Sequence, residues 1–357
     1  MKYEYNLDIY TKPFYEGDTV YYETALFIGE ESSIKTLFPI KEMVALLNYG
    51  LYEKYEEGKD YIYEGNTIKR LKGSRIPYFK KEEIYLKEPN DKNTLLEIID
   101  KDLLKEAEGG KYFLYGEQGT FTSKQIAIVY KHEPNIWKGT KAIYQGDKLA
   151  KTIQKLNNHE PVTLVFTGDS ITVGCDSSGT EHGGFLPPLA DSYPVMVHKK
   201  LEKEFNTKIK YINTAVGGTH AEWGLENIDE NVNQYNPDLV VVAFGMNNPY
   251  QDEEFFYNWA NQMVEKLTEH NKDVEIIFVS TTLPNPQCSW WGKQYQFIKA
   301  LKRISKPNVA VVDMTTMHQD LMDAGKKFVD MTANCVNHPN DFIARIYAQQ
   351  ILKTIIK

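Results

Sequence analysis

The sequence predicts an α/β protein in which a flavodoxin-like domain with a parallel, five-stranded sheet follows a β-rich domain of sandwich or jelly-roll type. After residue 160, short apolar and β-branched runs alternate with amphipathic stretches of helical length. This alternation is typical of strands buried between two layers of helices. Before residue 140, period-two segments are separated by Gly, Asn and Asp turns, which indicates short strands. We therefore expect domains at 1–140 and 160–357, joined by a linker and helix at 141–159.

Composition is ordinary for a globular protein. The chain has 357 residues, which favours two domains, and 42% are hydrophobic and 25% charged. The net charge is −8, with Lys and Glu interspersed, which argues against a nucleic-acid or anionic-membrane surface. The first residues lack the features of a signal peptide, no run has the length of a membrane span, and three cysteines cannot build a disulfide scaffold. These features predict a cytoplasmic protein.

The first 140 residues contain three strand-like regions and two helix-like segments. The strands are expected at 19–28, in a hairpin at 60–71 that turns at Gly65-Asn66, and at 122–130. The helices are expected near 40–47 and at 94–106. Tyrosine is dense here, and two interpretations stay open: a sugar-stacking face, or the cross-strand packing that is more usual for aromatic residues in strands.

Five strands and five helices are expected in the second domain. The strands lie at 162–166, 209–213, 239–244, 274–279 and 309–312. The helices lie at 193–205, 225–235, 253–270, 295–304 and 341–356, and the linker contains one more at 149–156. Open α/β sheets bind ligands where their strands end. We therefore expect the chemistry at these strand ends.

The first strand of this domain runs into Gly168-Asp169-Ser170, where the chain must turn sharply. All three residues are turn formers, so the tripeptide alone could be only a turn. A serine on a tight turn at the end of a central strand is also well placed to act as a nucleophile. We interpret Ser170 as the candidate nucleophile and Asp169 as a brace for the turn.

Three more loops carry polar signals. Gly217-Gly218 follows the second strand, where glycines let backbone N–H groups approach an anion or simply provide clearance for a helix. Asn247 follows the third strand and can donate to a developing negative charge or cap a helix. His338-Pro339 precedes the last predicted helix, and a lone loop histidine is usually solvated or packed. The occurrence of all four signals in this order along one sheet indicates a site.

Together these residues resemble the SGNH (GDSL-type) hydrolase superfamily, over just over half of the chain. The resemblance implies that Ser170 is the nucleophile and His338 the general base. It also implies an oxyanion hole formed by the N–H groups of Ser170 and Gly218 and the side-chain amide of Asn247, with Gly218 preferred to Gly217. The implied mechanism needs no metal and no other cofactor.

The chain departs from the superfamily pattern at one position. An aspartate usually stands three residues before the histidine, and here that position is Cys335, whose thiol is a poor hydrogen-bond acceptor. Some related sugar esterases resemble this arrangement and use a Ser-His dyad in which a backbone carbonyl orients the imidazole. We favour such a dyad here, with Asp330 and Asp341 as alternative acids. Cys335 and His338 could form half of a zinc site, but a matching second pair is missing from the sequence.

A β-rich module ahead of such a domain is similar to the layout of carbohydrate esterase family two and related deacetylases. We therefore expect a serine esterase that removes acetyl groups from acetylated mono- or oligosaccharides through an acyl-enzyme. Trp223, Trp290 and Trp291 are candidate substrate-binding residues, although each could equally anchor its loop. The alternatives are a lipid, thioester or aryl esterase of the same superfamily, and a carbohydrate-binding protein with a decayed esterase site. Whether the chain forms a homo-oligomer stays open.

Overall fold

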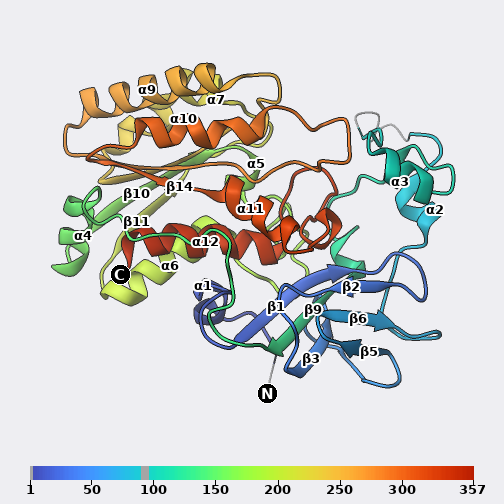
Figure 1. Ribbon diagram of the computed structural model, residues 1–357. Coiled ribbons are helices and arrows are strands. Elements are labelled where there is room, and N and C mark those ends of the chain that lie inside the picture. Colours follow the sequence, from blue (N-terminus) through green and yellow to red (C-terminus); the bar gives the residue numbers. More distant parts are fainter. Residues whose placement is uncertain (1–2, 90–95) are drawn as a thin grey trace.

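A parallel sheet forms the centre of the C-terminal part in the computed structural model, which describes residues 3–89 and 96–357 (Figure 1). Its strands are β10 (Val162–Gly168), β11 (Ile209–Asn213), β12 (Leu239–Ala243), β13 (Glu275–Val279) and β14 (Val309–Val312). They are all parallel and lie in the order β11-β10-β12-β13-β14. This is the flavodoxin-like order, so the predicted fold class is confirmed.

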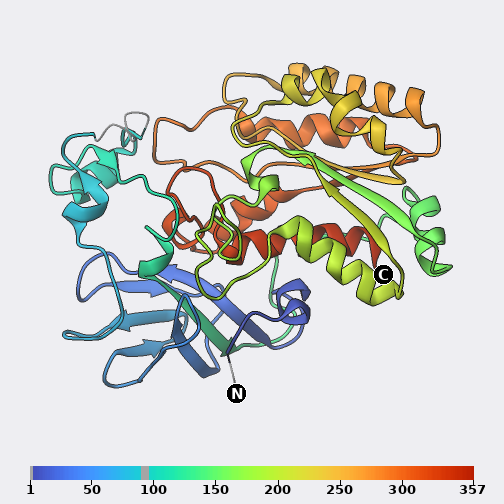
Figure 2. The ribbon, with the colours of Figure 1, turned by 180° about the vertical axis from the view of Figure 1, so that it is seen from behind.

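Helices cover both faces of this sheet (Figures 1 and 2). One layer contains α7 (Ala221–Glu226), α9 (Glu253–His270) and α10 (Phe297–Ile304), and the other contains α6 (Tyr193–Phe205) and α12 (Asp341–Ile355). In β12, Val240 and Val242 pack in the cluster that contains Phe256 and Trp259 of α9, whereas Val241 packs with residues of α6 and α12. Alternate side chains of a strand point to opposite faces, so a sheet buried on both faces requires this continuous apolar run.

Antiparallel strands are the main regular elements of the N-terminal part, which confirms the predicted β-rich region. They form a four-stranded sheet in the order β1-β9-β3-β4, a three-stranded sheet in the order β2-β6-β5, and the pair β7-β8. The strands are β1 (Thr19–Leu26), β2 (Ser33–Lys35), β3 (Glu42–Asn48), β4 (Lys54–Tyr55), β5 (Tyr61–Glu64), β6 (Thr67–Arg70), β7 (Tyr85–Leu86), β8 (Tyr112–Phe113) and β9 (Gln125–Lys131). The helices are α1 (Leu7–Thr11), α2 (Lys81–Ile84), α3 (Lys101–Glu106) and the 3-10 turn η1 (Thr122–Lys124).

Two of the predicted helices are wrong. The segment at 40–47 contributes to strand β3, because it pairs with β9 on one side and β4 on the other, and such pairing outweighs a weak local helical pattern. The helix predicted at 225–235 is broken into α7, α8 (Ile228–Asn231) and the 3-10 turn η2 (Asn233–Tyr235). Asn227 sits at the first break, where its backbone N–H and its side-chain amide both donate to the carbonyl of Trp223, at 3.1 Å and 2.8 Å, a local side-chain bond of the kind that competes with a continuing helix.

The remaining helical elements complete the chain. They are α4 (Ala150–Asn157), α5 (Ser170–Val173), the 3-10 turns η3 (Gln294–Gln296) and η4 (Phe328–Asp330), and α11 (Met314–Asp323), which the sequence pattern does not predict. The helix predicted at 94–106 is observed from Lys101, and residues 94 and 95 of that prediction lie outside the described residues. Within the described part of the chain, we find no helix whose length and hydropathy would let it cross a bilayer.

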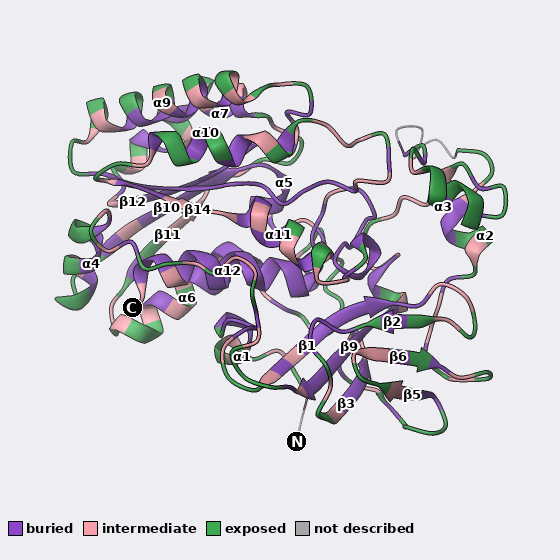
Figure 3. Ribbon diagram, viewed as in Figure 1, coloured by how far each residue is buried: buried purple, intermediate pink, exposed green. Residues whose placement is uncertain are grey.

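One hydrophobic core joins the two parts of the chain across the boundary predicted at residue 140. Tyr10 and Phe14 belong to the same cluster as Phe342 and Tyr347 of α12, and the ring centroids of Phe14 and Phe342 are 6.3 Å apart. Helix α12 is buried along nearly its whole length (Figure 3), because it packs between the parallel sheet and the N-terminal part. The division into domains at residue 140 remains a prediction.

A buried ion pair also links the two parts. The ammonium group of Lys326 lies 3.0 Å from Oε1 of Glu23 in β1 and donates to the carbonyl of Thr24 at 2.6 Å. The hydroxyl of Tyr130 donates to the other carboxylate oxygen of Glu23 at 2.6 Å. Both charged side chains are fully buried, and Oδ2 of Asp330 also lies 3.9 Å from the Lys326 ammonium. The Glu23 carboxylate has its ion-pair partner in Lys326, which compensates its buried charge.

Replacing Lys326 with methionine is expected to lower the free energy of unfolding by about 3–5 kcal/mol, because the Glu23 carboxylate would be left buried without its cation. Urea denaturation followed by circular dichroism measures the effect. The matched control is Lys327→Met, which changes an exposed neighbour and should cost less than about 0.5 kcal/mol. Equal stabilities of the two variants would contradict the importance of this ion pair.

Candidate active site

Ser170 lies at the first position of α5, directly after β10. Asp169 caps this helix, because its Oδ1 accepts a hydrogen bond from the N–H of Ile171 at 3.0 Å. Gly168 has no room for a side chain, since a Cβ there would lie 2.5 Å from the carbonyl oxygen of Ala243. Burial raises the pKa of Asp169 to about 6, against the opposing effect of backbone hydrogen bonds to its carboxylate. Asp169 therefore braces the turn that presents Ser170.

His338 stands in the loop before α12, whose backbone is bonded to the side chains of Asn334, Thr332 and Asn285. Oδ1 of Asn334 accepts hydrogen bonds from the backbone N–H groups of Val336, Asn337 and His338 at 2.9–3.0 Å. This arrangement directs the imidazole toward the nucleophile turn. His338 Nε2 lies 3.0 Å from Ser170 Oγ, so the two residues that the sequence singled out are within hydrogen-bond distance.

Asp176 contacts the other side of the imidazole. The prediction from sequence that a backbone carbonyl orients His338 in a Ser-His dyad is therefore wrong. Oδ2 of Asp176 lies 2.8 Å from Nδ1 of His338, and the side chain of Asp176 is buried. A carboxylate at this position keeps the proton on Nδ1 and leaves Nε2 to accept from the serine hydroxyl. The chain reaches this geometry through left-handed residues at Gly174 and Asp176, whose φ angles are +90° and +63°.

The alternative acids considered from the sequence have other partners. The two carboxylate oxygens of Asp330 accept hydrogen bonds from backbone N–H groups at 2.8 Å. Asp341 accepts from the backbone N–H of Ser178 at 3.0 Å. Cys335 lies in the apolar cluster that also contains Cys288, and burial raises the pKa of the Cys335 thiol. The position usual for the acid is thus a packed thiol, and the carboxylate that contacts His338 comes from the loop after Ser170.

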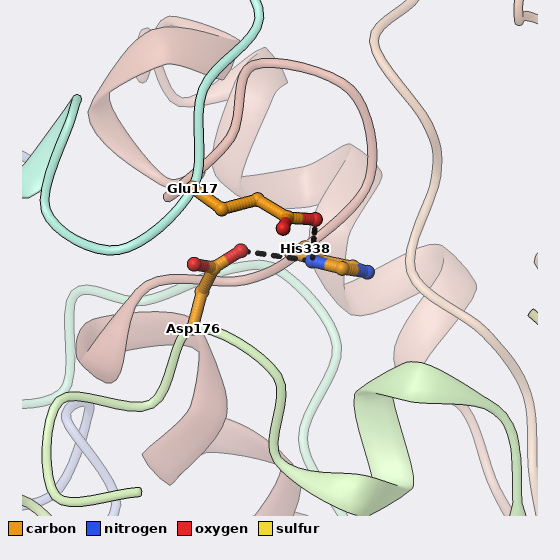
Figure 4. A group of neighbouring side chains, drawn as sticks. All are labelled: Glu117, Asp176 and His338. Atoms are coloured by element: carbon orange, nitrogen blue, oxygen red, sulfur yellow. Dashed lines mark hydrogen bonds and ion pairs between the residues drawn. The ribbon is translucent and has the colours of Figure 1, made fainter. Parts of the chain in front are cut away.

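Glu117 is a second residue that sequence reasoning missed. It comes from the N-terminal part, and its Oε1 lies 3.9 Å from His338 Nδ1 (Figure 4). One ligand-type atom each of Glu117, Asp176 and His338 lies within 4.8 Å of the others, a spacing that would also suit a divalent cation. The hydrogen bond between Asp176 and His338 already accounts for the close approach of two of the three groups.

The predicted oxyanion-hole residues lie on loops that meet near Ser170. A Cβ on Gly217 would lie 3.8 Å from Ser170 Cβ, which places the glycine turn beside Ser170. Gly218 adopts a φ of +77°, a conformation that favours glycine. The side-chain amide of Asn247 donates to the carbonyl of Thr219 at 2.8 Å, so Asn247 is tied to the same turn. The donor roles of Gly218 and Asn247 remain a prediction.

The three candidate tryptophans occupy different surroundings. Trp223 packs beside the α9 cluster, and Trp290 packs against the cluster that contains Cys335 and Val336 of the His338 loop. The ring of Trp291 lies parallel to that of Tyr295, with centroids 6.2 Å apart. All three tryptophans are partly exposed, and their substrate role remains a prediction.

Sequence comparison agrees with this arrangement. Residues 166–346, which include Ser170, Asp176 and His338, match the GDSL-like Lipase/Acylhydrolase family. The chain belongs to this family. The protein is therefore a hydrolase of the GDSL family, and the resemblance to the SGNH superfamily is confirmed. No curated protein sequence matches the chain.

Solved structures with similar folds include several esterases. A two-domain esterase (CEX) active on acetylated mannans is 22% identical with a TM-score of 0.48, and the match covers 60% of this chain and 54% of that one. The chain thus matches about half the length of that esterase. A variant of Axe2, an acetyl xylan esterase from Geobacillus stearothermophilus, is 20% identical with a TM-score of 0.44, covering 55% of this chain and 94% of that one. The lipase Lip_vut3 from a goat rumen metagenome is 18% identical with a TM-score of 0.43, and the match covers 54% of this chain and 96% of that one.

Proposed function

We propose that this hydrolase is a serine esterase that removes acetyl groups from acetylated mono- or oligosaccharides through an acyl-enzyme. The observation that carries the catalytic part of the proposal is the continuous contact from Ser170 Oγ to His338 Nε2, and from His338 Nδ1 to Asp176. A serine hydroxyl becomes an effective nucleophile when an oriented base takes its proton. The same continuity argues against a decayed site.

In the first half of the reaction, Ser170 Oγ attacks the acetyl carbonyl carbon while His338 Nε2 takes the hydroxyl proton. The oxyanion is received by the N–H groups of Ser170 and Gly218 and by the amide of Asn247. One N–H of that amide is bonded to Thr219, which leaves its second N–H for the oxyanion. Each such donor stabilises the transition state by about 3 kcal/mol.

The acyl-enzyme then forms, and water cleaves it. The tetrahedral intermediate collapses, the bond to the sugar oxygen breaks, and that oxygen takes the proton from His338. A water molecule then gives its proton to His338 and attacks the acetyl-Ser170 carbonyl. Collapse of the second intermediate returns the proton to Ser170 and releases acetate. Every step uses the chain's own residues.

The proposed sugar substrate is supported by aromatic residues near the Asn247 loop. Tyr295 is 46% exposed and is stacked with Trp291, and amphipathic rings of this kind stack well on sugar faces. The side chain of Gln294, next to Tyr295, donates to the carbonyl of Met246 at 3.2 Å. This bond ties the aromatic loop to the residue before Asn247.

A lipid or aryl ester substrate is the second candidate. It is favoured by the loop after the nucleophile, where Phe185 is 63% exposed and Leu189 is 52% exposed. Exposed apolar side chains on a loop that follows the proposed nucleophile in sequence are candidates to receive an acyl chain or an aromatic leaving group. The two candidates differ in the acyl length and alcohol that the enzyme prefers.

A substrate panel separates these candidates. Acetate release from acetylated xylo- and manno-oligosaccharides is measured beside the hydrolysis of p-nitrophenyl acetate and p-nitrophenyl octanoate. We expect acetate release from at least one sugar, and a kcat/KM for the acetyl ester at least about tenfold above that for the octanoyl ester. Preference for octanoate with no acetate from any sugar would overturn the carbohydrate assignment and favour the lipid or aryl esterase.

A further inference from the structure

A short segment of the N-terminal part enters the candidate active site. Residues 115–118 lie between β8 and η1, outside the residues that match the hydrolase family. The backbone N–H of Gln118 donates to Oδ1 of Asp176 at 3.0 Å, while Oδ2 of the same carboxylate faces His338. The segment therefore holds the far side of the acid that orients the imidazole.

Glu117 is held in place by its own neighbour. The hydroxyl of Tyr115 donates to Oε1 of Glu117 at 2.5 Å, and this same oxygen lies 3.9 Å from His338 Nδ1. Tyr115 is partly buried and packs on the apolar cluster that contains Phe113. Figure 4 shows the Glu117 and Asp176 carboxylates both directed at the imidazole.

We propose that Glu117 is a positioning residue for His338, a second carboxylate that stabilises the imidazolium formed when Ser170 is deprotonated. The N-terminal part would then belong to the catalytic apparatus as well as to the fold. This inference rests on the proposed function, because it requires His338 to act as the general base.

The charges around His338 support this role. The ionisable groups near the imidazole and the two carboxylates come from several elements: Tyr115, Glu117, Asp169, Cys175 and Asp176. Burial raises the pKa of Cys175 to about 12 and the pKa of Tyr115 above its usual value, so both are neutral near pH 7. The neighbours that are charged near pH 7 are therefore carboxylates, which attract a protonated His338. Asp169, whose pKa burial raises to about 6, loses part of its charge on the acidic limb of the profile.

The strength of the attraction between Glu117 and the imidazolium depends on how far Glu117 is exposed to solvent. Its side chain is 46% exposed, so solvent screens its attraction for the imidazolium. We expect Glu117→Gln, which keeps an acceptor for Tyr115, to lower kcat/KM at neutral pH by about threefold and to move the acidic half-maximum of the pH–rate profile down by about 0.5 pH units. The direction follows because a less stabilised imidazolium loses its proton at lower pH.

The experiment compares pH–kcat/KM profiles for p-nitrophenyl acetate among the wild type, Glu117→Gln, Tyr115→Phe and Glu64→Gln. Glu64 is an exposed carboxylate at the end of β5, and its replacement should leave the profile unchanged. Tyr115→Phe removes the bond that holds Glu117, and a smaller shift in the same direction is expected. At about 1 M salt, where the screening length is about 3 Å, the difference between Glu117→Gln and the wild type should shrink.

A profile for Glu117→Gln with the same half-maximum as the wild type would overturn the proposal, even if the rate fell, because a merely structural role lowers the rate without moving the midpoint. The same plate includes Ser170→Ala. An active Ser170→Ala would mean that the proposed function itself has failed, whereas an inactive Ser170→Ala with an unmoved Glu117→Gln profile would reject only the role of Glu117.

Discussion

Ser170→Ala is expected to lower kcat for acetyl-ester hydrolysis by about 10⁴-fold or more, because no acyl-enzyme can form without the hydroxyl. The hydroxyl has a hydrogen-bond partner in His338 Nε2, and the backbone of α5 is braced by Asp169. The variant should therefore fold normally. Steady-state hydrolysis of p-nitrophenyl acetate measures the loss, and circular dichroism checks the fold.

Ser123→Ala is a suitable control for Ser170→Ala. Ser123 is an exposed residue of η1 in the N-terminal part, and its replacement should leave kcat unchanged. If Ser170→Ala kept more than about a tenth of the activity, a different nucleophile or a directly activated water would have to be considered, since loss of a serine nucleophile costs orders of magnitude.

Asp176→Asn is expected to lower kcat by about 10³- to 10⁴-fold, although it changes only one atom of the side chain. The asparagine can still accept from the N–H of Gln118, as Asp176 does at 3.0 Å. Its amide would then donate to Nδ1 of His338, which puts the imidazole proton on Nε2. In that tautomer, Nε2 cannot accept the proton of Ser170. The pH-independent kcat measures this loss.

The matched control for Asp176 is another buried acid of the same region. Asp330→Asn removes a carboxylate that bonds backbone N–H groups and not the imidazole. It should lower the free energy of unfolding and leave kcat nearly unchanged. A loss of less than about tenfold in Asp176→Asn would contradict the assignment, because a Ser-His dyad oriented by a backbone carbonyl would be indifferent to this carboxylate.

The parallel sheet is predictable from sequence because its local and global requirements agree. Runs such as the one in β12 are apolar at every position, which suits a strand covered on both faces. The same reasoning places Ser170 and His338 at one edge of the sheet, where Ser170 Oγ and His338 Nε2 are 3.0 Å apart. Strand β3 is not predictable in this way, because its pairing with β9 and β4 comes from distant residues and its local pattern favours a helix.

The carboxylate that contacts His338 could not be identified from sequence for a related reason. The chain reaches the position of Asp176 beside His338 through left-handed conformations at Gly174 and Asp176. Its partner is 162 residues away in sequence. Glu117 lies in the N-terminal part, outside the family match. Its place beside His338 depends on how the two parts of the chain pack together.

The most direct test of the account is active-site labelling with a p-nitrophenyl phosphonate, followed by intact mass measurement and peptide mapping. We expect one label per chain, located on Ser170, with labelling strongly slowed in Asp176→Asn because that variant cannot activate the hydroxyl. A label on another residue, or an unlabelled protein that still hydrolyses acetyl esters, would contradict the assignment of Ser170, His338 and Asp176 as the catalytic residues.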